Sequence, residues 1–348
     1  MKGDPGQALS ELDRQIEQCR GDFVQEAELR AHKATWLTAL SKWSEGATEL
    51  AQAAELAGRA VEWQKQSEYL YGQGLLLARM PEQRGRAHQV WLRAASVAQL
   101  AKDGPMQIKA HRRIVQMYAG MADWAQAIAE SGVLLRLLEE NGMDRERVEA
   151  LRNRAAMHQM RQRADRAVKD LARAVDLAQT LDDPALSLQT RLHYKALDDY
   201  LHPEKAGSLA ELLVEAESLG DTASVAHIAL EQAGAALRAG RFDDAQEHAG
   251  RAREAALDGP DPVRYLLACA LIAEAREKLG DRAGVIEILL TCKGSLEDLL
   301  GPTAGQQVVV LLDSLEHRWG RDGVERALSD YRARAQTRAA GKDSRSTK

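Results

Sequence analysis

The chain has 348 residues and a formal net charge of −5, and charged residues make up 28% of it. This balance disfavours a general nucleic-acid binder and a broadly disordered chain. The sequence has no apolar run of about 18 residues, so no membrane span is expected, and its polar N-terminus has no apolar signal core. The composition therefore predicts a soluble, cytoplasmic protein.

A ladder of small or apolar residues recurs every 39 or 40 positions along the chain. Its eight members are Ala47, Ala87, Ala127, Ala167, Ala206, Ala245, Val285 and Val324. Further small or apolar residues follow each member after four and seven positions, and these offsets mark one face of an α-helix. A repeat at this fixed long period is typical of stacked helical units. The sequence thus predicts one all-α repeat array in place of several globular domains.

Turn signals divide this array into eight helical hairpins, in which Gly ends one helix and Asp caps the next. The first helices are predicted at 24–43, 60–80, 106–121, 144–162, 184–201, 222–239, 262–279 and 303–319. The second helices are predicted at 46–59, 84–102, 124–140, 164–181, 204–219, 242–257, 282–299 and 321–336. The expected organisation is a capping helix within residues 1–20, a solenoid over 21–337 and a disordered polar tail over 338–348.

Residues 226–257 carry the repeat pattern most fully. Small residues occupy its three contact positions, a glycine the turn and an aromatic residue the position after it: Ala233, Ala245, Ala252, Gly240 and Phe242. This pattern resembles the tetratricopeptide repeat (TPR) superfamily, in a variety with repeats of about 40 residues where about 34 is usual. The resemblance implies a right-handed α-solenoid of about eight helix-turn-helix repeats. Its first helices would line a concave groove that holds an extended peptide or a partner's helix.

One column of this implied groove carries arginine in three consecutive units, at Arg112, Arg152 and Arg191. The neighbouring columns add further polar groups, namely Lys109, Arg113, Asn153 and Lys195. Guanidinium groups stacked about 10 Å apart suit an acidic segment or a free C-terminal carboxylate, and Asn can fix a peptide backbone. The alternative is that these arginines pair with acidic residues on adjacent helices.

Aromatic and apolar side chains mark the two ends of the same groove. Trp36 and Tyr69 fall on groove columns, where they form either an anchor pocket for an apolar ligand side chain or core filling between long helices. Near the C-terminus, Leu267 and Val310 stand at groove positions. That end is expected to bury a partner helix or to associate with itself.

The sequence contains no phosphate-binding loop, zinc-ligand spacing or nucleophile elbow. Gly72 and Gly74 lie within a predicted helix, so close helix packing is favoured over a nucleotide loop. No cofactor, no metal and no catalytic residue are expected.

These features predict a non-catalytic adaptor or scaffold that binds a partner protein segment in its groove. The alternative is a peptide-sensing or sequestering regulator of bacterial signalling or transcription that acts through TPR repeats.

Overall fold

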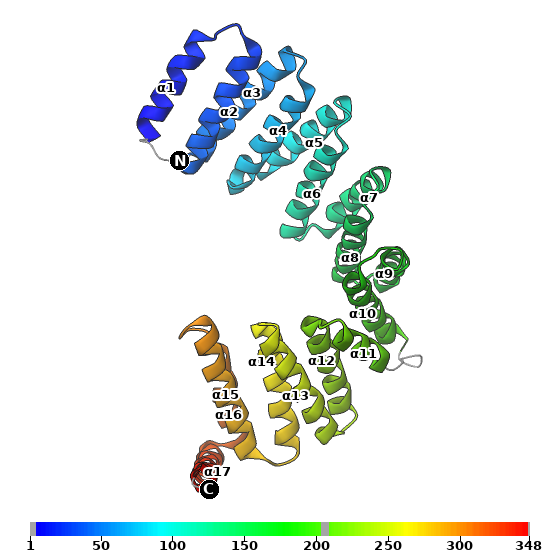
Figure 1. The fold of residues 1–348 in the computed structure, drawn as a ribbon, viewed down its shortest axis with the longest axis vertical. Helices are drawn as coiled ribbons and strands as arrows, with labels where there is room; N and C mark the ends of the chain where they lie inside the picture. The colour runs from blue at the N-terminus through cyan, green and yellow to red at the C-terminus, as the bar shows by residue number, and fades with distance from the viewer. Residues whose placement is uncertain (1–4, 203–208, 347–348) are drawn as a thin grey trace. The chain divides into compact units, whose positions relative to one another are not determined.

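The computed structural model describes residues 5–202 and 209–346, with side chains described up to residue 337. Within these ranges the chain forms 17 α-helices and one short 3₁₀-helix, and no strand (Figure 1). The all-α repeat fold that the ladder predicts is therefore confirmed. The chain divides into two compact units, Met1–Asp182 (unit 1) and Asp183–Lys348 (unit 2), so the solenoid expected as one body over 21–337 is shared between them.

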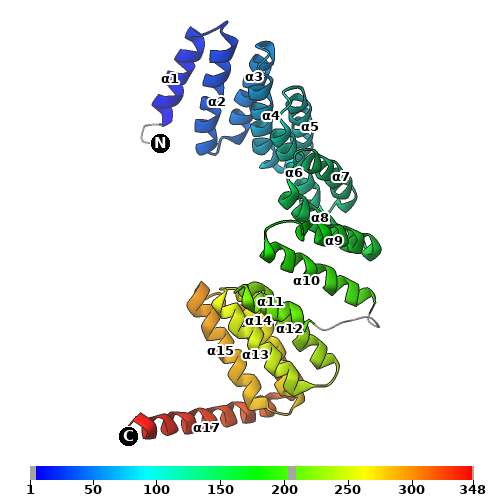
Figure 2. The same cartoon turned by 45° about the vertical axis from the view of Figure 1, so that its right-hand side comes forward.

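Unit 1 contains a capping helix and four hairpins that follow one another in chain order (Figure 2). Its helices are α1 (Pro5–Gln18), α2 (Phe23–Ala39), α3 (Trp43–Arg59), α4 (Trp63–Ala78), α5 (Arg84–Leu100), α6 (Gly104–Gly120), α7 (Trp124–Glu140), α8 (Asp144–Met160) and α9 (Ala164–Ala178). The 3₁₀-helix η1 (Pro81–Gln83) precedes α5. Helix α1 packs against α2, as a capping helix must if it is to cover the first hairpin.

Unit 2 contains the other four hairpins. Its helices are α10 (Pro184–Leu201), α11 (Ala210–Ser218), α12 (Thr222–Arg238), α13 (Phe242–Asp258), α14 (Pro262–Lys278), α15 (Arg282–Leu300), α16 (Gln306–Trp319) and α17 (Arg321–Ser346). The second helix expected at 204–219 begins only at Ala210, and residues 204–208 lie outside the described residues.

The last helix is longer than the sequence predicts. Helix α17 continues through residues 338–346, where a disordered tail is expected, and residues 347–348 lie outside the described residues. No proline interrupts this stretch, and five of its nine residues are Ala, Arg or Lys, which have high helix propensity. A polar composition by itself therefore does not distinguish a helix from a disordered tail.

The 40-residue period arises from a module of half that length. Helices such as α2, α6 and α12 span 17 residues each, and most are joined by three-residue connectors. In most of these connectors the middle residue takes a left-handed backbone conformation, as at Gly142 with φ 65° and Gly240 with φ 72°. Val61 and Ala122 adopt the same conformation without being glycine, at φ 63° and 56°. The connectors within hairpins and those between hairpins are thus of one kind.

Aspartates stabilise the start of many helices. The residue before each of these helices accepts a hydrogen bond from a backbone N–H three residues on, which satisfies one of the free donors of the first turn. These caps are Asp22, Asp103, Asp123, Asp183, Asp221, Asp261 and Asp281. The caps that the sequence predicts are therefore confirmed, and in α10 and α14 a proline follows the cap directly, where its missing N–H has no partner to lose.

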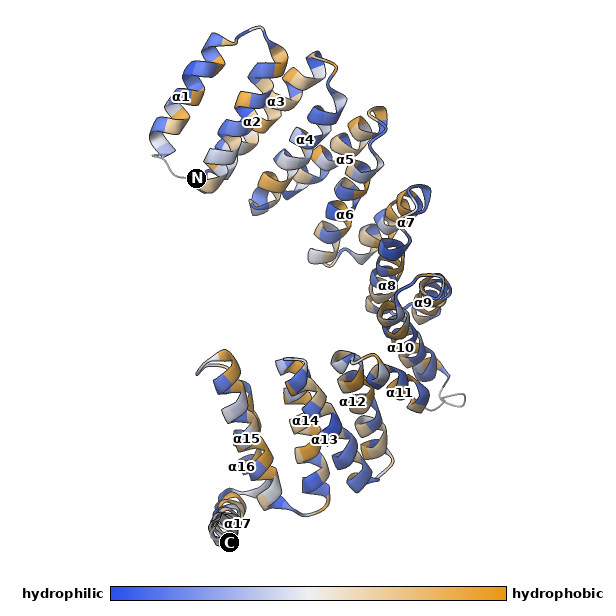
Figure 3. Ribbon diagram, in the orientation of Figure 1, coloured by the Kyte–Doolittle hydropathy of each residue, from blue (hydrophilic) through white to orange (hydrophobic). Residues whose placement is uncertain are grey.

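The alanine ladder lies in the core, where small side chains let neighbouring helices approach closely. Ala87, Ala127 and Ala167 have no exposed surface, whereas Ala206 lies outside the described residues. Figure 3 shows apolar and polar residues interspersed along each helix, as expected where one stripe is buried and the other exposed. The valine run at 308–310 lies inside α16, and its first residue, Val308, is fully buried.

Trp91 is the largest side chain in the core of unit 1 and depends on a glycine beside it. Its indole N–H donates to the carbonyl oxygen of Tyr71 at 3.2 Å, and the side chain is 2% exposed. A Cβ atom at Gly74 would lie 2.8 Å from Trp91 Cε2, whereas one at Gly72 would lie 3.2 Å from the terminal methyl of Leu50. The two glycines therefore serve helix packing, as the sequence predicts, and only Gly74 is required.

We expect Gly74→Ala to lower the free energy of unfolding by about 2 kcal/mol, because the buried indole has no room to move. Gly72→Ala is the matched control in the same helix. It should stay within about 0.5 kcal/mol of wild type, since the Leu50 methyl can rotate away and Ala favours helix. Urea unfolding followed by circular dichroism measures both, and equal stability of the two variants would contradict the close contact with Trp91.

The aspartate caps of unit 2 also predict how stability depends on pH. The backbone N–H of Arg264 lowers the pKa of Asp261, although partial burial of the carboxyl opposes this shift. A carboxyl with a lowered pKa in the folded state stabilises the fold above its unfolded pKa of about 3.9. That stability is lost as the pH falls through the folded pKa.

We therefore expect the urea midpoint of the wild-type chain to fall between about pH 5 and pH 3. Asp261→Asn should flatten this dependence, because Asn keeps the cap but does not titrate. Urea titrations at several pH values compare the two proteins, and parallel curves would show that Asp261 makes no such contribution.

Candidate functional site

A pocket of about 520 Å³ lies between α6, α7 and α8 in unit 1. It takes residues from two consecutive first helices, α6 and α8, and from the second helix α7 that stands between them in the chain. Its lining includes Arg112, Val115, Gln116 and Ala119 from α6, Trp124, Ser131, Leu134 and Leu138 from α7, and Glu146, Glu149, Ala150, Asn153, Ala156, Met157 and Met160 from α8. The first helices α6 and α8 thus both contribute to the lining of this pocket.

The floor of this pocket is apolar. Val115 and Leu134 are almost fully buried beneath it, and Met157 is 7% exposed. Met160, at the last residue of α8, is 63% exposed, and Trp124 at the first residue of α7 is half-buried. Methionine adapts its shape to different apolar groups, and an exposed methionine beside an aromatic ring is a common feature of binding surfaces.

Polar groups form the rim of the pocket. Arg112 and Asn153 are both exposed, and neither makes a hydrogen bond or ion pair with any described residue. Glu146 and Glu149 add two carboxylates to the same lining. The structure therefore brings Arg112 and Asn153 together at one apolar pocket, but it surrounds them with mixed charge where the sequence predicts a basic column.

The neighbouring basic residues lie beside this pocket. Arg113 donates from Nε to the hydroxyl of Tyr71 at 3.2 Å and from its terminal nitrogen to Gln116 Oε1 at 3.0 Å. Arg152 is half-buried and does not line the pocket; burial lowers its pKa, and the carboxylate of Glu149 opposes this shift. Lys109 is exposed on α6. Lys109 and Arg113 are thus both exposed, whereas Arg152 is half-buried.

The remaining basic residues of the predicted site belong to unit 2 and have partners there. Arg191 on α10 forms an ion pair with Glu215 on α11, and Lys195 pairs with Asp199 at 3.0 Å. For these two residues the structure favours the alternative in the sequence analysis, pairing with nearby acidic groups. The expected column of Arg112, Arg152 and Arg191 is therefore split between the two units, and its third member is engaged.

The two aromatic residues proposed as anchors contribute to packing. Tyr69 packs against the buried cluster of Ala54, Leu70, Ala94 and Val97, and burial raises the pKa of its hydroxyl. Trp36 is half-buried on α2. Tyr69 thus matches the core-filling alternative more closely than an open anchor pocket.

The apolar groove positions of unit 2 are accessible. Leu267 is 50% exposed on α14 and Val310 is 67% exposed on α16. Self-association through these repeats stays a prediction.

Sequence analysis did not single out Trp124, Met157 and Met160 as site residues. A methionine at the end of a helix has no sequence signal that separates exposure from burial. Their contribution to the pocket depends on the crossing of α6 and α8 over α7.

Metal ligation and membrane insertion have no support in the described residues. Among them, no three His, Cys, Asp or Glu side chains lie close enough together to hold a metal ion. In the same part of the chain, no helix combines the length and apolar character that crossing a membrane requires.

Comparison with known proteins identifies the fold. No known family model and no curated protein matches the chain. Among solved structures, aspartyl phosphate phosphatase F from Bacillus subtilis is 11% identical, with 91% of this chain and 96% of that chain covered and a TM-score of 0.50. The apo form of RapI is 14% identical, with coverage of 78% and 70% and a TM-score of 0.43.

A signal transduction ATPase with a tetratricopeptide repeat sensor, from Pyrococcus horikoshii, is 10% identical with a TM-score of 0.45. This chain matches it over 88% of its own length and 50% of the ATPase. The likeness to phosphatase F shows the fold, and the chain is accordingly a helical-repeat protein with TPR-like hairpins.

Proposed function

We propose that the protein is a non-catalytic, cytoplasmic adaptor that binds an extended segment of a partner protein at the pocket between α6, α7 and α8 (the groove pocket). The observation that carries this proposal is the pairing of an accessible apolar site, with Met160 63% exposed, and two unengaged polar groups, Arg112 and Asn153. A rigid array of helices presents such a site at little conformational cost to itself.

Each part of the groove pocket has a role in this proposal. An apolar side chain of the partner contacts Met157, Met160 and Trp124 and loses its contact with water. Arg112 binds a carboxylate of the partner, either an acidic side chain or a free C-terminus, through two parallel hydrogen bonds. Asn153 hydrogen-bonds the partner backbone. Glu146 and Glu149 restrict the negative charge of the partner to the neighbourhood of Arg112.

No catalytic activity is proposed for this chain. Phosphatase F carries an activity in its name, but at 11% identity the comparison reaches the fold alone. Arg191 and Lys195 are left out of the proposed site, because both already have carboxylate partners within unit 2.

The test is a peptide selection on the wild-type protein, followed by affinity measurements on variants with fluorescence anisotropy. Met160→Asp should weaken the selected peptides at least about tenfold, since it places a charge in the apolar part of the pocket. Met121→Asp is the matched control: Met121 is 43% exposed at the end of α6 and does not line the groove pocket.

Lys109→Glu with Arg112→Glu should weaken peptides that carry a carboxylate and leave peptides without one nearly unchanged. Helicity measured by circular dichroism confirms that each variant is folded. If Met121→Asp and Met160→Asp weakened binding equally, or neither did so, the groove pocket would not be the binding site.

A further inference from the structure

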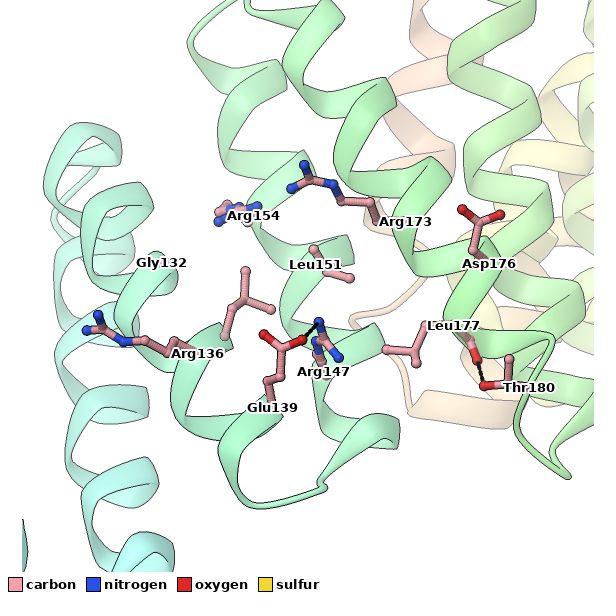
Figure 4. Close-up of a pocket in the computed structure, with 11 residues that line it drawn as sticks. Gly132, Arg136, Glu139, Arg147, Leu151, Arg154, Arg173, Asp176, Leu177 and Thr180 are labelled. Atoms are coloured by element: carbon pink, nitrogen blue, oxygen red, sulfur yellow. Dashed lines mark hydrogen bonds and ion pairs between the residues drawn. The ribbon is translucent and has the colours of Figure 1, made fainter.

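A second pocket, of about 610 Å³, lies between α7, α8 and α9 (Figure 4). It is separate from the groove pocket, because it uses another face of α8. Arg147, Leu151 and Arg154 line it with the spacing of one helical stripe. The residues of α8 that line the groove pocket, among them Glu146 and Asn153, fall on a neighbouring stripe. We call this second site the arginine pocket.

Four guanidinium groups and two carboxylates line the arginine pocket. Two of the arginines are engaged. Arg147 donates to Glu139 at 2.5 Å, and Arg154 donates from Nε to the buried carboxylate of Asp170 at 2.7 Å. The Arg154 pair is well shielded, with side-chain exposures of 17% for Arg154 and 6% for Asp170. These two arginines are held in place by their carboxylate partners, which neutralise them.

The other two arginines are available. Arg136 on α7 and Arg173 on α9 are exposed, and neither has a hydrogen bond or ion pair with any described residue. Figure 4 shows the Arg136 and Asp176 side chains on opposite sides of the view, so the second carboxylate does not neutralise Arg136. Binding an anion at Arg136 and Arg173 therefore breaks no internal ion pair.

Apolar side chains form the wall between these charges. Leu135 is 8% and Leu151 is 5% exposed, and Leu177 is half-buried. A ligand that carries only charged groups would leave these leucine side chains in contact with water. A ligand that places an apolar side chain between two carboxylates matches both the arginines and the leucines.

The spacing of the arginines indicates the size of this ligand. Arg136 on α7 and Arg173 on α9 belong to helices that each pack against α8. Each step between packed helices is about 10 Å, so the two helices lie about 20 Å apart. An extended peptide advances about 3.3 Å per residue, so about six residues reach from one arginine to the other. A small anion would contact one arginine only.

We propose that the arginine pocket binds an acidic segment of a partner protein, in which carboxylates flank apolar residues. Arg136 and Arg173 bind the carboxylates, and Leu135, Leu151 and Leu177 cover the apolar side chains. The net charge of the whole chain is −5, so an acidic segment is not attracted to the molecule at large. Binding of such a segment would therefore depend on the local charge of this pocket and not on the net charge of the chain. The adaptor would thus carry two separate binding sites on unit 1.

The probe is a fluorescein-labelled hexapeptide with two leucines between two pairs of glutamates, measured by fluorescence anisotropy at about 50 mM NaCl. The control peptide has glutamine in place of every glutamate. We expect the acidic peptide to bind the full-length protein with a Kd below about 1 mM and at least about tenfold more tightly than the control. Raising the salt to about 300 mM should weaken it.

Two double variants with the same change in net charge separate the two pockets. Arg136→Glu with Arg173→Glu should lower the affinity for the acidic peptide at least about tenfold. Lys109→Glu with Arg112→Glu, which alters the groove pocket, should lower it by a clearly smaller factor than the first pair does. The four residues are exposed and their side chains make no described hydrogen bond or ion pair, so both variants should fold, and circular dichroism checks this.

Equal weakening by both variants would overturn the inference, because it would reflect overall charge. So would a wild-type protein that does not bind the acidic peptide, or that binds the glutamine peptide equally well. If only Lys109→Glu with Arg112→Glu lost affinity for the acidic peptide, the acidic ligand would belong to the groove pocket and the inference would be wrong. Failure of the groove proposal would appear separately, in the response of selected peptides to Met160→Asp.

Discussion

Close contact between neighbouring helices is the constraint on which the structure depends. A helix in this array has to bury a stripe against the helix before it and the helix after it, and alanine at the crossing points keeps the backbones near one another. Ala87, Ala127 and Ala167 have no exposed surface for this reason. Where a large side chain does enter the core, as at Trp91, a glycine on the facing helix removes the steric conflict. Larger residues at the ladder would separate the helices and expose the core.

Regular connectors follow from the same constraint. When helices of 17 residues are joined by three residues, the buried stripe of each helix faces the next helix. Adding or removing a connector residue would rotate that stripe away from its neighbour. The left-handed middle residue turns the chain sharply enough to keep the stripe facing its neighbour. That Val61 and Ala122 adopt this conformation shows that packing of the helices overrides the backbone preference of the residue.

Because each helix buries only one stripe in the core, its other faces are available for polar groups. In α8, one face contributes Glu146, Asn153 and Met160 to the groove pocket, and a neighbouring face contributes Arg147 and Arg154 to the arginine pocket. The two pockets differ in charge because one arginine and two glutamates line the groove pocket, whereas four arginines and two carboxylates line the arginine pocket. Asp170 neutralises Arg154 from α9, whereas no described partner neutralises Arg136 and Arg173. A single helix in this way lines two pockets of different chemistry.

The sequence by itself determined the number of hairpins, their order and most helix ends. These are local properties: a helical stripe, an aspartate before it and a glycine after it lie within a few residues of one another, and each has a direct physical effect on the backbone. The same patterns also placed Arg112 and Asn153 on first helices, close enough to share a pocket.

Only the tertiary structure decided which charged groups are free. Arg191 meets Glu215 on the next helix, and Arg154 meets Asp170 on another, whereas Arg112, Arg136 and Arg173 meet no described carboxylate. All five are arginines on predicted helices, and their sequence contexts do not separate them. An ion pair between helices depends on how far the two helices lie apart and how each is rotated about its axis. Those quantities follow from side-chain packing over the whole unit, and no local pattern encodes them.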